Sequence, residues 1–347
     1  MPAYTHHIAL LGGGTIGLSM AALHLRRPDT KVTLYDPRPD IEAQVREILP
    51  AFLDTPDTTT IDNLLSSNRL TLTKTIQEAV QSATTIQEQS PEVTTSKQAL
   101  WKEVSRFASS SAKLWSSSSG IAASAQGALC DVHIREKLIV AHPFNPPHLM
   151  PLIEVVPGPE TLSEEVEYVQ QYFKEVPGPK KGGISGNGNA SEKDTSSTVS
   201  GQYYRPVVLH KEVPGFVGNR LAFALLREAC YLVGEGVISV RDLDELMMAS
   251  LGPRWAGSGL FESYHAGGGE GGIGAFLKKL APTMSDVWGG LGQVNVSVDG
   301  DGPAEGWRGT VVKQAEEAYG ASSSSESKQR TQAMLRGVIE LQKESGK

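Results

Sequence analysis

One histidine of this chain stands where a general base could act. His142 follows the apolar run Leu138–Ala141, which we expect to be a buried strand, and Glu154 lies twelve residues further on, within the next strand. Imidazole suits proton transfer because its unperturbed pKa lies near neutral pH. A carboxylate bonded to the other ring nitrogen fixes the tautomer and stabilises the imidazolium. The pair could take the proton of a substrate hydroxyl, although a lone histidine at a strand end is more often a structural hydrogen-bonding group.

Ser119 is another polar residue that follows a predicted strand, Leu114-Trp115. It lies in a serine-rich loop and by itself indicates little. Because ligands of open α/β sheets bind outside the carboxyl ends of the strands, Ser119 and His142 are candidates for one site. The other histidines show no metal-ligand spacing, and Cys130 and Cys230 are expected to be reduced thiols, so we predict no metal site and no disulfide.

Residues His7–Asp36 contain a strand, a glycine turn, a helix, a second strand and an acid, in that order. Gly12, Gly14 and Gly17 fit the pattern G-x-G-x-x-G directly after the apolar run His7–Leu11. In such a motif the first glycine permits a tight turn, the second lets the backbone approach a pyrophosphate, and the third lets helix and strand pack closely. By itself the pattern could be a glycine-rich loop, but its ordered surroundings predict a dinucleotide site.

The two ends of this unit supply the predicted contacts to the cofactor. Thr15 and Ile16 begin the helix, where exposed backbone N–H groups hold phosphates. Asp36 lies at the tip of the second strand, Val32–Tyr35, nineteen residues after Gly17. Its carboxylate can accept the two ribose hydroxyls of an adenosine.

The first part of the chain alternates strands and helices. Further strands are predicted at Leu70–Leu72, Ala83–Glu88, Leu152–Val156 and Pro206–His210, and helices at Ile41–Leu53, Ile76–Gln81, Lys97–Phe107 and Ser163–Lys174, with Ser163 as a possible N-cap. This alternation predicts an α/β fold with a Rossmann-type, mostly parallel sheet over residues 1–213. Residues 179–201 are polar and glycine-rich, and we interpret them as a flexible surface insertion.

The pattern changes at Pro214, after which only helices are expected. They are predicted at Val217–Gly234, with Leu221, Leu225, Ala229 and Leu232 on one face, and at Val240–Leu251, Phe276–Leu280, Trp307–Tyr319 and Thr331–Leu341. We therefore predict an all-α C-terminal domain over residues 214–347.

The composition excludes several classes of partner. The chain has 347 residues and a net charge of −7, which argues against nucleic acid or an anionic membrane surface as the main partner. No apolar run approaches the roughly 18 residues of a membrane span. The first strand begins close to Met1, so we expect no cleavable signal and a cytoplasmic location.

The chain resembles the 3-hydroxyacyl-CoA dehydrogenase superfamily, and within it most closely the λ-crystallin / L-gulonate 3-dehydrogenase branch. The resemblance runs from about His7 to His265, and its most specific blocks are His142–Pro147 and Pro214–Arg220. Further segments that carry it are Gly12–Gly17, Ile86–Glu88 with Pro91-Glu92, Ser116–Ser119, Pro151–Glu154, Gly234–Ser239 and Asp242–Asp244.

The resemblance implies roles for the candidate residues at the reacting centre. His142 would be the catalytic base and Glu154 its partner, while Ser119 and Asn219 would hold the substrate oxygen. Asn145 falls on a polar position beside the active site. Asn219 could instead cap a helix or bond to the backbone at a helix start.

Two further residues are implied near the cofactor. Glu88 falls on a strand end near the nicotinamide ribose. Lys97, at the start of the next helix, could reach the cofactor or could be a solvated lysine. Because members of this family usually pair two subunits through the helical domain, a homodimer is implied, with substrate binding and dimerisation assigned to residues 214–347.

The choice of cofactor and substrate depends on charged residues. Asp36 repels a 2′-phosphate, so NAD is preferred over NADP, although Arg38 leaves room for NADP. Relatives that use acyl-CoA carry lysines after the second strand, whereas this chain has none between Asp36 and Leu70, which favours a small acid. Arg254 matches an arginine of the gulonate-type branch and could bind a substrate carboxylate bidentately, or could be a surface or interface arginine.

The leading hypothesis is an NAD-dependent dehydrogenase that oxidises the 3-hydroxyl of a small polar 3-hydroxy acid such as L-gulonate. A 3-hydroxyacyl-CoA or carnitine-type substrate is the alternative within the same class. A non-catalytic nucleotide-binding protein with a structural or sensing role, like a lens crystallin, is the alternative from another class. The chain departs from the family at Leu260, where a proline is usual, and in its glycine-rich segment Gly267–Gly274.

Overall fold

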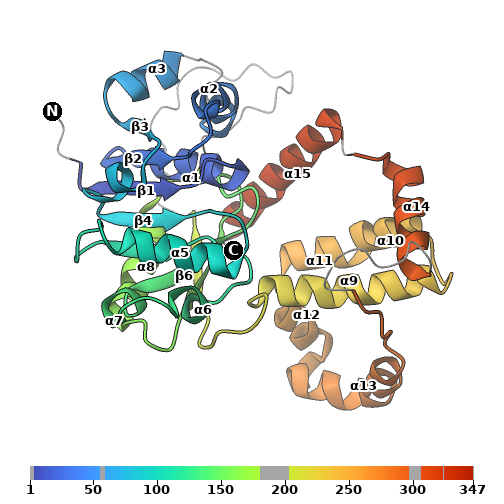
Figure 1. Cartoon of the computed structure of the whole chain (residues 1–347). Helices are drawn as coiled ribbons and strands as arrows, with labels where there is room; N and C mark the ends of the chain where they lie inside the picture. The colour runs from blue at the N-terminus through green and yellow to red at the C-terminus, as the bar shows by residue number, and fades with distance from the viewer. Residues whose placement is uncertain (1–3, 55–58, 180–202, 297–305, 323, 347) are drawn as a thin grey trace. The chain divides into compact units, whose positions relative to one another are not determined.

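The computed structural model describes residues 4–54, 59–179, 203–296, 306–322 and 324–346. The chain forms two compact units, Met1–Arg220 and Leu221–Lys347 (Figure 1). The predicted insertion at residues 179–201 lies outside the described residues except for Pro179.

The N-terminal unit is built on one sheet of eight strands in the order β3-β2-β1-β4-β5-β6-β7-β8. The strands are β1 His6–Leu11, β2 Thr30–Tyr35, β3 Leu70–Thr73, β4 Thr85–Glu88, β5 Lys113–Ser116, β6 Leu138–Pro143, β7 Leu152–Pro157 and β8 Arg205–Val208. Neighbouring strands from β3 to β6 are parallel, β7 runs antiparallel to β6, and β8 is parallel to β7. The predicted Rossmann-type, mostly parallel sheet is therefore confirmed.

Helices cover both faces of this sheet. They are α1 Thr15–Leu25, α2 Ile41–Phe52, α3 Thr59–Ser66, α4 Ile76–Val80, α5 Thr94–Val104, α6 Ala123–Gly127, α7 Val132–Arg135 and α8 Ser163–Glu175. The short helices α6 and α7 were not predicted, because one turn is too brief to show a periodic pattern. Ser163 is not the N-cap of α8, since Leu162 occupies that position and makes no side-chain capping bond.

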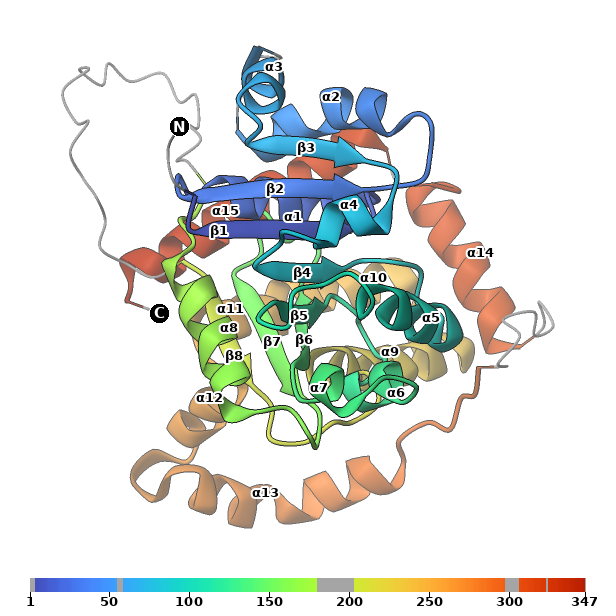
Figure 2. The same cartoon turned by 60° about the vertical axis from the view of Figure 1, so that its left-hand side comes forward.

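Alternate residues of β5 show how the two faces are filled. Leu114 is buried in a core with Trp101 and Val104 of α5. Trp115 points to the other face, where its ring lies 5.2 Å from that of Tyr172 and 5.5 Å from that of Phe173, both on α8. Figure 2 shows α5, α6 and α7 on one side of the strands and α8 on the other. Burial on both faces explains the continuous apolar runs of the strands.

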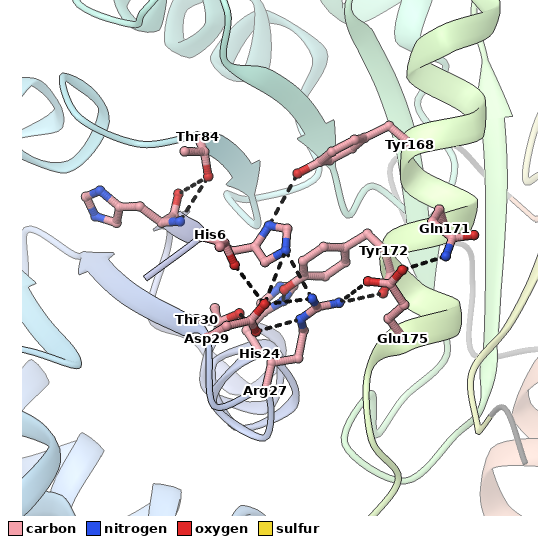
Figure 3. A network of polar contacts seen from close by, with 12 residues as sticks. His6, His24, Arg27, Asp29, Thr30, Thr84, Tyr168, Gln171, Tyr172 and Glu175 are labelled. Carbon is pink, nitrogen blue, oxygen red and sulfur yellow. Dashed lines mark hydrogen bonds and ion pairs between the residues drawn. The ribbon is translucent and has the colours of Figure 1, made fainter. Parts of the chain in front are cut away.

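A network of polar contacts lies at the amino ends of the strands (Figure 3). Arg27 forms ion pairs with Asp29 and with Glu175, each at 3.0 Å. His24 is fully buried beside it and bonds to the hydroxyl of Tyr172 through Nδ1 at 2.7 Å and to Gln87 through Nε2 at 2.8 Å. The network ties β1, α1 and β2 to α8, at the edge of the sheet opposite the glycine turn.

The C-terminal unit is helical, and its described residues include no strand. Its helices are α9 Gly218–Gly234, which begins just before the unit boundary, α10 Val240–Leu246, the π-turn η1 Met247–Leu251, α11 Gly252–Gly257, α12 Leu260–Gly267, the 3₁₀ turn η2 Gly269–Gly271, α13 Gly272–Gly289, α14 Trp307–Tyr319 and α15 Ser325–Glu344. The all-α prediction for this region is confirmed. None of the described helices of the chain is both long and apolar enough to cross a membrane.

Two helices of this unit extend well beyond the predicted ranges. Helix α13 begins at Gly272, within the glycine-rich segment, rather than at Phe276. Helix α15 begins near Ser325 instead of Thr331, because the Ser324 side chain accepts a bond from the backbone N–H of Ser327 and starts the helix earlier. The first turn of α15 has no apolar residue, and that of α13 has Ile273 as its one large apolar residue, so apolar periodicity marks neither start.

Candidate active site

The glycine turn has the predicted geometry at the carboxyl end of β1. Gly12 has φ of +119°, and a Cβ at Gly17 would lie 1.9 Å from the carbonyl oxygen of Gly12, so both positions require glycine. Gly14 faces open space, and the adjoining residues Thr15 and Ile16 begin α1. Because the first N–H groups of a helix have no intrahelical acceptor, this turn presents donors to a phosphate.

Asp36 lies beside this turn, as the sequence predicts. Its carboxylate accepts hydrogen bonds from the backbone N–H of Gly13 at 2.8 Å and from the Arg38 guanidinium at 2.8 Å on each oxygen. Burial raises the pKa of Asp36, but the bonds from Arg38 and Gly13 outweigh it and hold the pKa below its usual value. The carboxylate is therefore ionised and fixed next to the phosphate-binding turn.

His142 and Glu154 form the predicted pair. They are directly opposite each other on the antiparallel strands β6 and β7, and Nδ1 of His142 lies 2.8 Å from Oε2 of Glu154. The other carboxylate oxygen accepts backbone N–H groups of Val217 at 3.1 Å and Gly218 at 2.8 Å. Burial raises the pKa of Glu154, whereas these three bonds lower it, and the net pKa is below the usual value. An ionised Glu154 therefore orients the imidazole.

A cavity of about 390 Å³ is bordered both by His142 and by Ile16 of the G-x-G-x-x-G segment. It is lined by Ile16, Gln89, Ser90, Glu92, Lys97, Ser117, Ser119, His142, Pro143, Phe144, Asn145 and Asn219. The ring of His142 lies 4.9 Å from Phe144 and 5.6 Å from Phe216. In the described part of the chain no group bonds to Nε2 of His142, so this nitrogen is available for a ligand in the cavity.

Three predicted substrate residues border the same cavity. Ser119 and Asn145 are exposed there, and Asn219 is half-buried. The side-chain amide of Asn219 donates to the backbone carbonyl of Ser119 at 2.9 Å. Asn219 therefore makes the backbone bond that the sequence left open as its alternative role, and it positions the Ser119 loop.

Glu88 lies at the end of β4, as expected, but its side chain is enclosed by other protein groups. It is completely buried and does not line the cavity. Its carboxylate accepts bonds from Lys97 at 2.6 Å, from the backbone of Ser90 at 2.6 Å and from the hydroxyl of Ser116 at 2.7 Å. Lys97 is 1% exposed, so the alternative of a solvated lysine is wrong. The two residues form a buried ion pair in which Lys97 borders the cavity and Glu88 does not.

Glu92 is the carboxylate that does line the cavity, and the sequence analysis assigned it no role. One oxygen accepts the backbone N–H groups of Ser119 and Gly120, each at 3.0 Å, and the hydroxyl of Ser118, while Lys97 lies 3.2 Å from the other. Burial raises its pKa, but Ser118 and Lys97 hold the pKa below the usual value. Its position four residues beyond a strand end, before a helix, was the available signal.

The residues present fit a dinucleotide. The turn at Gly14 is open, and Ile16 of the same turn borders the cavity that contains His142. Gln89, between the turn and the cavity, has a buried side-chain amide with no hydrogen-bond partner on either atom among the described residues. Such an orphaned polar group is costly unless a ligand or water satisfies it.

Two other predictions concern residues away from this cavity. Arg254 lies on α11 in the C-terminal unit and is exposed, so its contact with a substrate carboxylate stays a prediction. Among the described residues, no group of three or more His, Cys, Asp or Glu is placed to hold a metal ion.

Comparisons with known proteins agree with this geometry. Residues 7–184 match the family described as "3-hydroxyacyl-CoA dehydrogenase, NAD binding domain", and residues 215–287 match "3-hydroxyacyl-CoA dehydrogenase, C-terminal domain". The chain is 32% identical over 280 residues to an L-carnitine dehydrogenase of Mesorhizobium japonicum, covering 81% of this chain and 69% of that protein. It is 33% identical to an L-carnitine dehydrogenase/betainyl-CoA thioesterase of Rhizobium sp, covering 81% of this chain but only 50% of that protein.

A solved structure supports the fold over almost the whole chain. The chain is similar to 5-formyl-3-hydroxy-2-methylpyridine 4-carboxylic acid 5-dehydrogenase, with a TM-score of 0.69 and 24% identity over 97% of both chains. At this identity the likeness bears on the fold alone. Together, the family matches and the 32% identical relative show that the chain belongs to the 3-hydroxyacyl-CoA dehydrogenase family and is an NAD-dependent dehydrogenase.

Proposed function

We propose that this protein oxidises the 3-hydroxyl of a small 3-hydroxy acid, with His142 as the base and L-carnitine as the leading candidate substrate. The observation that carries the proposal is the His142–Glu154 pair, whose free nitrogen borders the cavity reached from the glycine turn. Relatives named L-carnitine dehydrogenase favour this substrate over L-gulonate, the leading candidate from the sequence.

The geometry accounts for the proton transfer. The carboxylate of Glu154 accepts the hydrogen on Nδ1 of His142, so Nε2 carries the lone pair that removes the proton of the substrate hydroxyl. Glu154 then stabilises the imidazolium across 2.8 Å. NAD, when bound, accepts the hydride from the carbon that carries this hydroxyl. Ser119 and Asn219, which both line the cavity, would hold the substrate oxygen, and Asn219 also donates to the Ser119 carbonyl.

Cofactor binding is assigned to the groups on the turn and around it. We propose that Gly12–Gly17 hold the pyrophosphate and that Asp36 accepts the adenosine ribose hydroxyls. Lys97 and Glu92 border the cavity and would act at its nicotinamide end, with Glu88 supporting Lys97 from behind. This set makes NAD, rather than NADP, the expected cofactor.

The charges favour a small substrate over a CoA thioester. The three arginines between Asp36 and Leu70 are engaged by other protein groups: Arg38 by Asp36, Arg46 by Glu42 and Asp62, and Arg69 by backbone carbonyls. No lysine lies in this segment, so the anionic phosphates of CoA lack a basic partner here. The cavity instead offers an ionised carboxylate, Glu92, and the ring of Phe144, both suited to a quaternary ammonium.

A panel of hydroxy acids tests the assignment. NADH formation should be followed with L-carnitine, D-carnitine, L-gulonate and 3-hydroxybutyryl-CoA, using His142→Ala as the blank. We expect turnover with L-carnitine. Faster oxidation of L-gulonate or of the CoA thioester would replace the proposed substrate, and no NADH formation from any hydroxy acid would favour the non-catalytic, crystallin-like alternative.

We further propose a homodimer formed through the helical unit. Apolar side chains on α9 are exposed in the single chain, among them Leu221 at 60% and Leu225 at 43%, on the face that the sequence marked as apolar. Exposed apolar surface of this kind is typical of an interface. Light scattering on the purified protein should give twice the mass of one chain, and a monomer would contradict the proposal.

A further inference from the structure

Protein donors occupy the whole hydrogen-bonding capacity of the Asp36 carboxylate. One oxygen accepts the backbone N–H of Arg38 at 2.9 Å and its Nε at 2.8 Å. The other accepts the backbone N–H of Gly13 and Nη2 of Arg38, both at 2.8 Å. An ionised carboxylate offers about four lone-pair sites, so these four donors saturate it.

The Arg38 side chain covers Asp36 and is itself held in place. Its Nη1 donates to Gln44 of α2 at 3.1 Å, and Nη2 also donates to the carbonyl of Gly13 at 3.0 Å. The Asp36 side chain is 7% exposed, whereas that of Arg38 is 41% exposed. The carboxylate is therefore nearly enclosed, and the Arg38 side chain bonded to it is the more exposed of the two.

We propose that Arg38 is a specificity-determining residue that competes with the adenosine ribose for Asp36. This inference depends on the assignment of Asp36 to the ribose in the proposed function. The two ribose hydroxyls replace the two guanidinium donors on Asp36, while the backbone donors of Gly13 and Arg38 remain. Binding of NAD is therefore opposed by a preformed ion pair, which lowers its apparent affinity.

The displaced guanidinium also changes the response to NADP. It stays tethered two residues from Asp36, the residue to which we assign the ribose hydroxyls, one of which is the 2′-hydroxyl. Its positive charge offsets the repulsion between Asp36 and a 2′-phosphate, because guanidinium groups pair strongly with phosphate. Arg38 therefore reduces the preference for NAD over NADP in two ways. It lowers the affinity for NAD, and it raises the affinity for NADP.

The test is equilibrium binding of NAD and NADP, measured by titration calorimetry without substrate. Arg38→Gln should bind NAD about threefold to tenfold more tightly and NADP more weakly by a similar factor. Arg46→Gln is the matched control, since the Arg46 side chain is 40% exposed, nearly the same as that of Arg38, and is likewise paired with carboxylates. Arg46 lies on α2 and has no bond to Asp36. This variant removes the same charge and should shift both affinities by less than about twofold.

Two further variants separate the steps of the inference. Arg38→Lys keeps the charge but loses the fork, so NAD should bind more tightly while NADP stays near the wild-type affinity. Arg38→Lys also supplies the result if Arg38→Gln does not fold. Weaker NAD binding in both Arg38 variants, or shifts equal to those of Arg46→Gln, would overturn the competition. Asp36→Asn with unchanged NAD affinity would instead overturn the assignment of Asp36 to the ribose.

Discussion

Two buried histidines at opposite edges of the same sheet show what separates a reactive group from a structural one. His142 is 5% exposed and bonds to Glu154 through Nδ1, while Nε2 borders a cavity. His24 is completely buried, and both of its nitrogens are bonded, to Tyr172 and to Gln87. Burial is therefore common to both, whereas the free nitrogen and the bond to a carboxylate belong to His142.

The charged groups around each histidine differ in the same way. Around His24, Arg27 is paired with Asp29 and Glu175, so the charges of the amino-edge network are satisfied by each other (Figure 3). Burial lowers the pKa of His24 to about 4, which keeps it neutral at physiological pH. At the carboxyl edge, Glu154 bonds to Nδ1 of His142, and no described group bonds to Nε2. We infer that the first network supports the fold and the second supports chemistry.

The largest effect is expected from His142→Ala. Loss of the base should lower kcat by about 10³-fold, within the range measured for general bases, because alanine cannot accept the hydroxyl proton. The dissociation constant for NAD should stay within about twofold of wild type, since Asp36 and the glycine turn are untouched. Steady-state kinetics and NAD titration check both expectations.

The comparison requires that the equivalent change at the other edge leave turnover intact. His24→Leu, assayed as folded protein, should keep kcat within about threefold of wild type. If His142→Ala kept its rate, the assignment of the base would be wrong. If His24→Leu lost turnover as severely as His142→Ala, the division between the two edges would fail.

A smaller loss is expected from Glu154→Gln. The amide oxygen would accept the backbone N–H groups of Val217 and Gly218, which turns the amide NH₂ toward Nδ1 of His142. The imidazole must then carry its proton on Nε2, which is the wrong tautomer for a base. We expect kcat to fall by about 10²-fold with NAD affinity unchanged. Nitrogen NMR of the histidine ring should report the switch of tautomer, and Glu175→Gln should show neither effect.

The sequence predicted the positions of those site residues that lie on or directly after a strand. The apolar runs before His142 and around Glu154 placed these residues on neighbouring strands, and the antiparallel register brings them opposite each other. Gly12 and Gly17 were predicted for steric reasons that the structure confirms. These features depend on short local patterns and on the rule that ligands bind at the carboxyl ends of strands.

The sequence did not reveal which carboxylate lines the cavity, although it did point to Lys97. Glu88 ends β4 and was expected at the cofactor, but Lys97 and Ser116 hold it inside. Glu92 was passed over although its carboxylate lines the cavity. Whether a carboxylate is buried depends on partners from other segments, and no local pattern shows those partners. The bond from Asn219 to the Ser119 carbonyl, across one hundred residues, was open for the same reason.

The pH dependence of stability should sharpen the contrast at the amino edge. In the unfolded chain His24 takes up a proton near pH 6.5, whereas in the folded protein its pKa is about 4. The unfolded state therefore binds more protons between these values, and stability falls as the pH falls through this range. Between pH 7 and pH 5 this single group should remove about 2 kcal/mol of the free energy of unfolding.

The lowered pKa values of Asp29 and of Glu175 also make stability fall with pH, but at lower pH than His24 does. His24→Leu separates the contribution of His24 from theirs. The variant is less stable than wild type at pH 7, because Tyr172 and Gln87 lose their partner, but the difference should shrink by about 2 kcal/mol at pH 5. Denaturant unfolding at the two pH values measures it. His133→Leu, at an exposed site on α7, is the control. A constant difference would show that His24 is not held neutral by burial.

The smallest effect is expected from Glu175→Gln, which tests whether the amino-edge network is structural as a whole. The Glu175 side chain is 47% exposed, so its ion pair with Arg27 is screened by solvent. Arg27 keeps its pair with Asp29, and we expect the free energy of unfolding to fall by less than about 1 kcal/mol, with kcat and NAD affinity unchanged. Thermal unfolding and steady-state kinetics measure both. Gln87 bonds to both His24 and Ser117, and Ser117 lines the cavity, so a path of hydrogen bonds connects the two edges. A fall in kcat without loss of stability would mean that this path couples the amino-edge network to the active site.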